Sequence, residues 1–226
     1  MKTMPSFNQV EWYWNRLRCM SVSEIMGRAG KQACHAVARR RGPVSVPQAR
    51  FERSGARWLP REIPESAGQA VARANELLSG HWRIFARGAL PLGFPPEWNR
   101  NPDKGALVPM EFGKAMSFRD PAETGDIKYL WEPNRHLELV CLAQAWQVTG
   151  DSRYLEAIGT ALDSWFVQCP YPLGANWSSA LEAGIRLINW ATVWQLIGGL
   201  QSPLFANPLG KVLRSEEHTS ELQSLA

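Results

Sequence analysis

Three helical patterns follow one another between residues 134 and 199, and they constrain the fold more than any other feature of the chain. The first has apolar residues three and four positions apart, which places them on one face of a helix: Leu137, Val140, Cys141, Ala145 and Val148. Pro133 is suited to open this helix, because an N–H in the first turn needs no partner. Gly150 can end it in the left-handed conformation. We therefore expect a helix over 134–149.

The second and third patterns predict helices over 151–168 and 178–199. Asp151 is a suitable N-cap for the second helix, which carries an apolar stripe of its own: Leu155, Ile158, Ala161, Leu162, Trp165 and Phe166. In the third helix, Ser179 and Glu182 have the spacing of a capping box. This helix is apolar around most of its circumference, so it should be buried on most sides. Short loops between such helices predict antiparallel hairpins, as in an all-α array or an α/α toroid.

The amino-terminal section is strongly basic and predicts two further helices, over 8–17 and 21–41, with Ser21 or Ser23 capping the second. Up to Arg61 it has twelve Lys or Arg against three Glu, a net charge of +9. Such a charge attracts a polyanion, whether a uronate polymer, nucleic acid or lipid headgroups, unless it is only a solvated face. No nucleic-acid-binding motif accompanies it, so nucleic acid is not an expected partner.

The section that follows is punctuated by proline and glycine. Four prolines in 42–64 indicate an extended linker. After the linker we expect a helix over 65–79, a short strand over 81–86 and then a long Gly- and Pro-rich loop over 91–124. A loop of that length in a compact domain often has a function.

These patterns predict three parts. Residues 1–64 hold the basic helices and the linker, and residues 65–213 form a partial helical domain. Residues 214–226 resemble the in-frame translation of a sequencing adapter and show no apolar pattern. We therefore treat them as a non-native tail and expect the chain to be a fragment whose native reading frame is lost near Leu213.

Several classes of site are absent from the sequence. The four cysteines form no Cys-x-x-Cys pair, which indicates neither a zinc site nor a disulfide framework. There is no phosphate-binding glycine loop and no His-Glu-x-x-His, so we expect no cofactor and no metal. No long apolar run follows the amino terminus, so the sequence predicts neither a secretory signal nor a membrane span.

The segment that precedes the first of the three helices gathers polar and aromatic residues. It reads Asp126-x-Lys128-x-x-Trp131-Glu132-x-Asn134-Arg135. Further motifs follow it in order: Thr149-Gly150-Asp151, then Asn176-Trp177, then Glu182-x-x-x-Arg186 with Trp190. As a set, over residues 8 to 200, these motifs resemble the N-terminal α-helical domain of the heparinase II/III-like polysaccharide lyases.

The resemblance implies an incomplete α/α toroid without the β-sandwich domain that follows it in the family. It also implies an enzyme that cleaves uronic-acid-containing polysaccharide by β-elimination in the periplasm, with the cytoplasm as the alternative because no export signal is present. The family's catalytic Asn, Tyr and His lie further along the toroid and in the sandwich. We therefore assign no catalytic residue here and expect the chain alone to be inactive.

We expect substrate contacts from six residues near helix starts: Asn134, Arg135, His136, Asn176, Trp177 and Arg186. Arg135 can bind a sugar carboxylate or sulfate through two parallel hydrogen bonds, or it can form a structural ion pair with Glu132 or Glu182. Asn176 and Trp177 can offer an amide and a stacking face, or they can cap a helix and fill the core. Arg186 lies one turn from Glu182 and can pair with it.

Two other function classes stay open. A glycoside hydrolase on an α/α toroid needs two carboxylates across a cleft, and Asp126, Glu132 and Glu182 can supply them. A non-enzymatic helical-repeat scaffold that binds carbohydrate is the other, since residues 143–165 resemble a tetratricopeptide unit. No second copy of that unit occurs, however, and repeat arrays need several.

Overall fold

The computed structural model describes residues 7–42, 59, 67–116, 124–199, 202 and 204. The chain divides into two compact units, Met1–Gly42 and Pro43–Ala226, and each is described by itself. The tail at 214–226 and nearly all of the expected linker lie outside the described residues, as does the end of the long loop at 117–123.

The first unit consists of two helices, α1 (Phe7–Arg18) and α2 (Val22–Arg41). Ser21 caps α2, because its side-chain oxygen accepts a hydrogen bond from the backbone N–H of Glu24 at 3.3 Å. The helix ends at Gly42, whose φ of +70° lies in the region that favours glycine. Both helices predicted for this section are confirmed.

The second unit is mainly helical, as the all-α prediction requires. Its elements in chain order are α3 (Ala67–Leu78), β1 (His81–Arg83), η1 (Phe85–Arg87), β2 (Ala89–Pro91), η2 (Gly113–Ala115), α5 (Ile127–Asn134), α6 (Leu137–Thr149), α7 (Ser152–Gln168), η3 (Ala175–Trp177) and α8 (Ala180–Leu196). The two strands pair antiparallel with Trp82 opposite Leu90. None of the described helices combines the length and the apolar character needed to cross a membrane.

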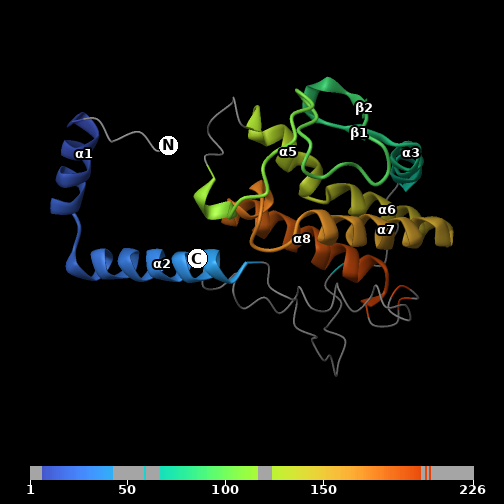
Figure 1. The fold of residues 1–226 in the computed structure, drawn as a ribbon. Coiled ribbons are helices and arrows are strands. Elements are labelled where there is room, and N and C mark those ends of the chain that lie inside the picture. The colour runs from blue at the N-terminus through green and yellow to red at the C-terminus, as the bar shows by residue number, and fades with distance from the viewer. Residues whose placement is uncertain are drawn as a thin grey trace. The chain divides into compact units, whose positions relative to one another are not determined.

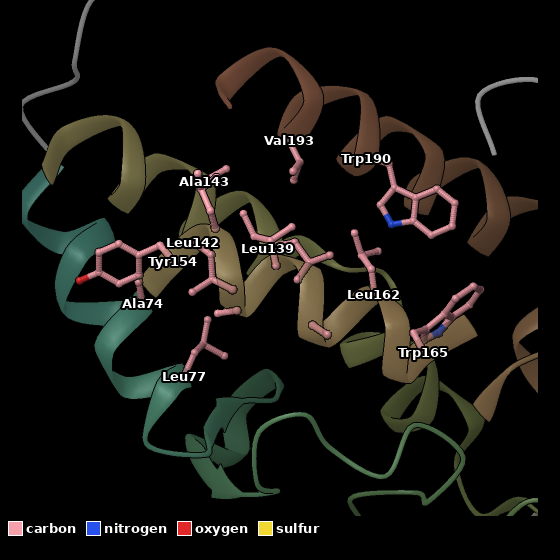
Figure 2. Packing of buried hydrophobic residues seen from close by; sticks show 14 of the residues in the cluster. Ala74, Leu77, Leu139, Leu142, Ala143, Tyr154, Leu162, Trp165, Trp190 and Val193 are labelled. Carbon is pink, nitrogen blue, oxygen red and sulfur yellow. The ribbon is translucent and has the colours of Figure 1, made fainter. Parts of the chain in front are cut away.

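Helix α6 is the centre of the second unit, since α3, α7 and α8 all pack against it (Figure 1). Its buried side chains meet those of the three neighbours in one hydrophobic cluster (Figure 2). The labelled members of that cluster are Ala74, Leu77, Leu139, Leu142, Ala143, Tyr154, Leu162, Trp165, Trp190 and Val193. A helix with neighbours on three sides buries most of its circumference, which explains why α6 is apolar nearly all round.

The face predicted for this central helix was wrong in part. Leu137 and Val148 from the predicted stripe are exposed, whereas Leu139 and Leu142 are buried. Periodicity selects a face reliably only when the opposite face is polar, and α6 has no such polar face. The third helix, α8, was expected to be buried on most sides, but Leu181 lies on an exposed side.

The expected helix start at residue 134 was also wrong. Pro133 does not open α6 but lies inside α5, near its carboxyl end. Helix α5 ends at Asn134, and α6 begins at Leu137 after a sharp break. At the break His136 adopts the left-handed conformation with φ +61°, which is uncommon outside glycine. The boundary between α6 and α7 is as predicted: Gly150 ends α6 in the left-handed conformation, and the Asp151 side chain caps α7 by accepting from the N–H of Arg153.

The described part of the long loop is fixed to the carboxyl end of α7. The backbone N–H of Trp98 donates to Gln168 Oε1 at 3.1 Å, and Asn99 Nδ2 donates to the Gln168 carbonyl at 2.6 Å. Further along, Phe112 forms a β-bridge with Leu173. The loop therefore reaches the segment that carries η3.

The packing around α6 predicts a large difference between two truncations on α7. Leu162→Ala removes a side chain that is 3 % exposed and should lower the free energy of unfolding by about 2–5 kcal/mol. Val167→Ala, at a position that is 80 % exposed, should change it by less than about 0.5 kcal/mol. Urea titrations followed by circular dichroism measure both, and equal effects would contradict the packing described here.

Candidate functional site

The six residues predicted to contact substrate come together in the structure. Asn134, Arg135 and His136 form the junction between α5 and α6, Asn176 and Trp177 lie in η3, and Arg186 lies on α8. Hydrogen bonds and ring contacts connect this cluster, which we call the junction cluster. Most of it is buried, however, with Asn134, His136, Asn176 and Arg186 each no more than 2 % exposed.

Arg186 is the centre of the junction cluster. Its Nη1 donates to the carbonyl of Asn134 at 3.0 Å and its Nη2 to the carbonyl of Asn176 at 2.9 Å. The guanidinium also lies 4.7 Å from the ring centroid of Trp165 and 5.2 Å from that of Trp177. Carbonyl dipoles and ring faces thus replace part of the water that a buried cation loses. The result is a clamp that holds the α5 end and η3 on α8.

Arg135 ties α5 to α8 at the edge of the cluster. Its Nε and Nη2 bind both oxygens of Glu182 at 2.7 and 2.9 Å, and its Nη1 binds Glu132 at 2.6 Å. The hydrogen bond with Glu182 is the main reason why the pKa of Arg135 is raised. This is the structural ion pair that the sequence left open for Arg135. Because two carboxylates already occupy the guanidinium, Arg135 is poorly placed to bind a sugar anion.

The predicted capping box at the start of α8 does not form. Ser179 occupies the N-cap position, but its side chain accepts no capping hydrogen bond. Glu182 directs its carboxylate to Arg135 instead of back to the N-cap. A bidentate bond to a cation is stronger than a bond to a neutral backbone N–H, which explains the choice.

His136 is buried among aromatic rings. Its Nδ1 accepts a hydrogen bond from Trp190 Nε1 at 2.7 Å, and the rings of Trp98 and Trp165 lie 5.2 and 5.1 Å from its own ring. Burial, with the nearby Arg186 charge, lowers the pKa of His136 well below its usual range. The imidazole is therefore neutral with its proton on Nε2, an atom that has no hydrogen-bond partner among the described residues.

The two asparagines hold backbone and ring groups in place. Asn134 donates to the carbonyls of Trp98 and Leu130 at 2.9 and 2.8 Å, and its Oδ1 accepts from Trp165 Nε1 at 2.8 Å. Asn176 Nδ2 donates to Cys169 Sγ at 3.1 Å. Burial raises the pKa of the Cys169 thiol to about 12, so the thiol stays protonated. Both amides thus serve the architecture, as the sequence allowed for Asn176.

A partly exposed set of side chains surrounds η3, and we call it the η3 rim: Lys114, Trp131, Tyr171 and Trp177. Trp131 Nε1 donates to the carbonyl of Ala175 at 3.1 Å, and Lys114 Nζ donates to the carbonyl of Ser178 at 3.3 Å. Tyr171 lies edge-on to Trp177 at 5.0 Å. Burial lowers the pKa of Lys114.

Sequence reasoning missed Lys114 and Tyr171 as site residues, because Lys114 lies in the short helix η2 within the expected long loop and Tyr171 lies in a turn after α7. One signal was available in Gly113, beside Lys114. A Cβ on Gly113 would lie 2.7 Å from the carbonyl oxygen of Gly174 and 2.9 Å from the Trp177 carbonyl carbon. Only glycine allows the loop to approach η3 this closely.

The carboxylates proposed for a glycoside hydrolase have other partners. Glu132 and Glu182 both bind Arg135, and Asp126 accepts from the backbone N–H of Lys128 as the N-cap of α5. Within the described ranges, no group of three His, Cys, Asp or Glu side chains is placed to hold a metal ion.

Glu138 is a buried acid on the first turn of α6. Its Oε1 lies 3.6 Å from Arg73 Nη2, and its Oε2 has no hydrogen-bond partner in the part of the chain that the structure describes. Burial raises the pKa of Glu138 from 4.5 to about 7, against a smaller lowering by Arg73. Sequence reasoning missed Glu138, although a single charge in an otherwise apolar helix was the available signal.

Comparisons with known proteins add no relative. No protein-family model matches the chain, and neither a search of curated proteins nor one of solved structures finds a match. The likeness to the polysaccharide lyases is therefore carried by the motif residues alone.

The clamp formed by Arg186 predicts a large loss of stability on substitution. Arg186→Gln withdraws donors from the buried carbonyls of Asn134 and Asn176, and it should lower the free energy of unfolding by about 3 kcal/mol or more. Arg153→Gln on the exposed face of α7, where the arginine pairs with Asp151 in solvent, should have a much smaller effect. Guanidinium chloride titrations measure the free energy of unfolding of both variants, and a small effect at Arg186 would contradict its central role.

Glu138 predicts a pH dependence of stability. Its pKa is higher in the folded chain (about 7) than its ordinary value of 4.5, so the folded state binds more protons between these values. The stability that Glu138 contributes is then fully present below about pH 4.5 and is lost as the pH rises through 7, by about 3 kcal/mol in full.

Glu138→Gln should remove this slope, which urea titrations from about pH 5 to about pH 8 measure. Glu156→Gln, at an exposed position on α7, is the control that should leave the slope in place. A slope that survives Glu138→Gln would contradict the assignment.

Proposed function

We propose that this chain forms the amino-terminal part of a polysaccharide lyase that cleaves uronic-acid-containing polysaccharide by β-elimination, within an incomplete α/α toroid. The observation that carries the proposal is the η3 rim. There, three partly exposed aromatic side chains and one lysine surround a segment held by motif residues that are far apart in the sequence.

The chemistry of the η3 rim suits an acidic sugar. Aromatic faces such as those of Trp131, Tyr171 and Trp177 pack against the apolar C–H surface of a sugar ring. The ammonium group of Lys114 can bind the carboxylate of a uronate as a point charge. Arg135 is not assigned this role, because Glu132 and Glu182 occupy its guanidinium.

The buried residues have a different role in this proposal, which is to position the rim. Arg186 fixes the carbonyl of Asn176 in η3, and Trp177 Nε1 donates to the carbonyl of Cys169 at 2.9 Å. A subsite that is held by buried hydrogen bonds loses little entropy when it binds. The junction cluster therefore supports the substrate surface from beneath.

The chemical step is assigned to residues outside this chain. β-Elimination needs a base for the proton next to the carboxylate, an acid for the leaving oxygen and donors that neutralise the carboxylate. By the resemblance these groups belong to later toroid helices and a β-sandwich, and the enzyme works in the periplasm. Each of these groups accelerates the reaction by about two to four powers of ten. We therefore propose that a chain without them binds the polysaccharide but does not cleave it.

Binding tests the proposal with the chain itself. Affinity electrophoresis should show retardation by alginate or heparan and none by neutral dextran. Lys114→Met should weaken this retardation about tenfold, which corresponds to one lost ion pair. Lys128→Met, at an exposed position on α5, should leave it unchanged. Equal retardation by dextran, or no effect of Lys114→Met, would contradict a uronate subsite at the η3 rim.

Activity tests the reaction class. A gene that continues through the native sequence beyond residue 213 should release an unsaturated uronate that absorbs in the ultraviolet, whereas this chain should release none. Reducing ends that form without ultraviolet absorption would favour the glycoside hydrolase alternative. Cleavage by this chain alone would show that its own residues are catalytic.

A further inference from the structure

Helix α2 in the first unit has an apolar face that nothing in the described structure buries. Its apolar residues recur at helical spacing along one side: Val22, Ile25, Met26, Ala29, Ala33 and Val37. The structure buries no residue of α2, and Val22 and Met26 are 78 % and 67 % exposed. An exposed apolar stripe along a 20-residue helix marks an interaction surface.

The opposite side of α2 is basic. Arg28, Lys31 and Arg39 lie there, and Arg40 and Arg41 close the helix. The acid on this side, Glu24, is paired with Arg28 at 2.9 Å. From residue 7 to residue 42 the unit has seven Arg or Lys against two Glu, a net charge of +5. The surface that α2 meets is therefore anionic.

Helix α1 adds to the same character. Trp14 and Leu17, three residues apart on one face, are both exposed. Trp12 is exposed too and has the Arg16 guanidinium 5.0 Å from its ring centroid. Tryptophan beside arginine is typical of segments that lie where the headgroups of a bilayer meet its hydrocarbon.

We infer that α2, with Trp14 and Leu17 of α1, lies on the surface of an anionic lipid bilayer. An amphipathic helix with Lys or Arg on its polar face and large apolar residues on the other lies in the plane of the interface. The bilayer accepts the Met26 side of α2 into hydrocarbon while its anionic headgroups meet the arginines. The lipid is the occupant that uses both faces.

Other polyanions use only half of this surface. A uronate polymer or a nucleic acid offers charges to Arg28 and Lys31, but no apolar phase for Val22, Met26 and Val37. Helix α2 has five Lys or Arg and one Glu among its 20 residues, and none of the described helices combines the length and the apolar character that a membrane span needs. The inference concerns the first unit alone and is independent of the proposed lyase activity.

The test is flotation of the full chain with vesicles. Vesicles of phosphatidylcholine with about 30 % phosphatidylglycerol should bind it, and phosphatidylcholine alone should bind it at least about tenfold more weakly. Met26→Glu should reduce binding about tenfold or more. Val167→Glu places the same charge at an exposed apolar position of α7 and should have no effect.

Substitution of the arginines is a second test of the inference. Replacing Arg39, Arg40 and Arg41 together by glutamine should reduce binding by roughly a hundredfold, and raising the salt should act in the same direction. Binding to heparin that needs the arginines but is indifferent to Met26→Glu, without vesicle binding, would replace the lipid by a soluble polyanion. A dimer in solution that Met26→Glu dissociates, without vesicle binding, would replace it by a second copy of the chain.

Labelling α2 with a dye tests its orientation on the bilayer without a new charge, so this experiment applies even if Met26→Glu unfolds the helix. In a background with Cys19→Ser and Cys34→Ser, a polarity-sensitive dye is attached through Met26→Cys or, as the matched control, Lys31→Cys. Anionic vesicles should shift the emission of the dye at position 26 to the blue and leave that at position 31 unchanged. Equal shifts at both positions, or none at either, would overturn the inference.

Discussion

The buried guanidinium of Arg186 is the interaction on which the second unit depends. It binds the carbonyls of Asn134 and Asn176, which belong to the end of α5 and to η3. The Asn134 carbonyl lies at the end of a helix and the Asn176 carbonyl lies in a short turn. At such places no backbone N–H is available to donate a hydrogen bond to the carbonyl. One side chain from α8 thus replaces the missing backbone partners of two segments. Without it the break between α5 and α6 would leave polar groups buried without donors.

The aromatic residues around this cation explain much of the tryptophan content. The Trp165 ring contacts Arg186 on its face, donates to Asn134 through Nε1 and lies against His136, Trp177 and Trp190. A large ring with one N–H fills core volume and can also donate a hydrogen bond, which suits a core that contains polar groups. Tryptophan around Arg186 in the second unit is therefore first a core residue, whereas Trp131 and Trp177 stay partly exposed.

The sequence was sufficient where local chemistry decides the structure, as at Gly150 and Asp151, which end and start helices through their own backbone and side chain. It was insufficient where a distant partner decides. Pro133 reads as a helix start, yet packing places it inside α5, and Glu182 reads as a capping residue, yet Arg135 takes its carboxylate. The six candidate residues come together in the structure, but sequence spacing does not measure depth. The sequence therefore left open whether Asn176 and Trp177 face a substrate or fill the core, and only the structure shows that Asn134, His136, Asn176 and Arg186 are buried.

The central claim is that Arg186 is a desolvated clamp held by two specific carbonyls, and its side-chain NMR signals test this most directly. In ¹⁵N-labelled protein the two Nη groups should give separate signals that exchange slowly with water, since rotation and solvent access are blocked. Couplings through the hydrogen bonds should join them to the carbonyl carbons of Asn134 and Asn176. A single averaged signal in fast exchange with water would contradict the account.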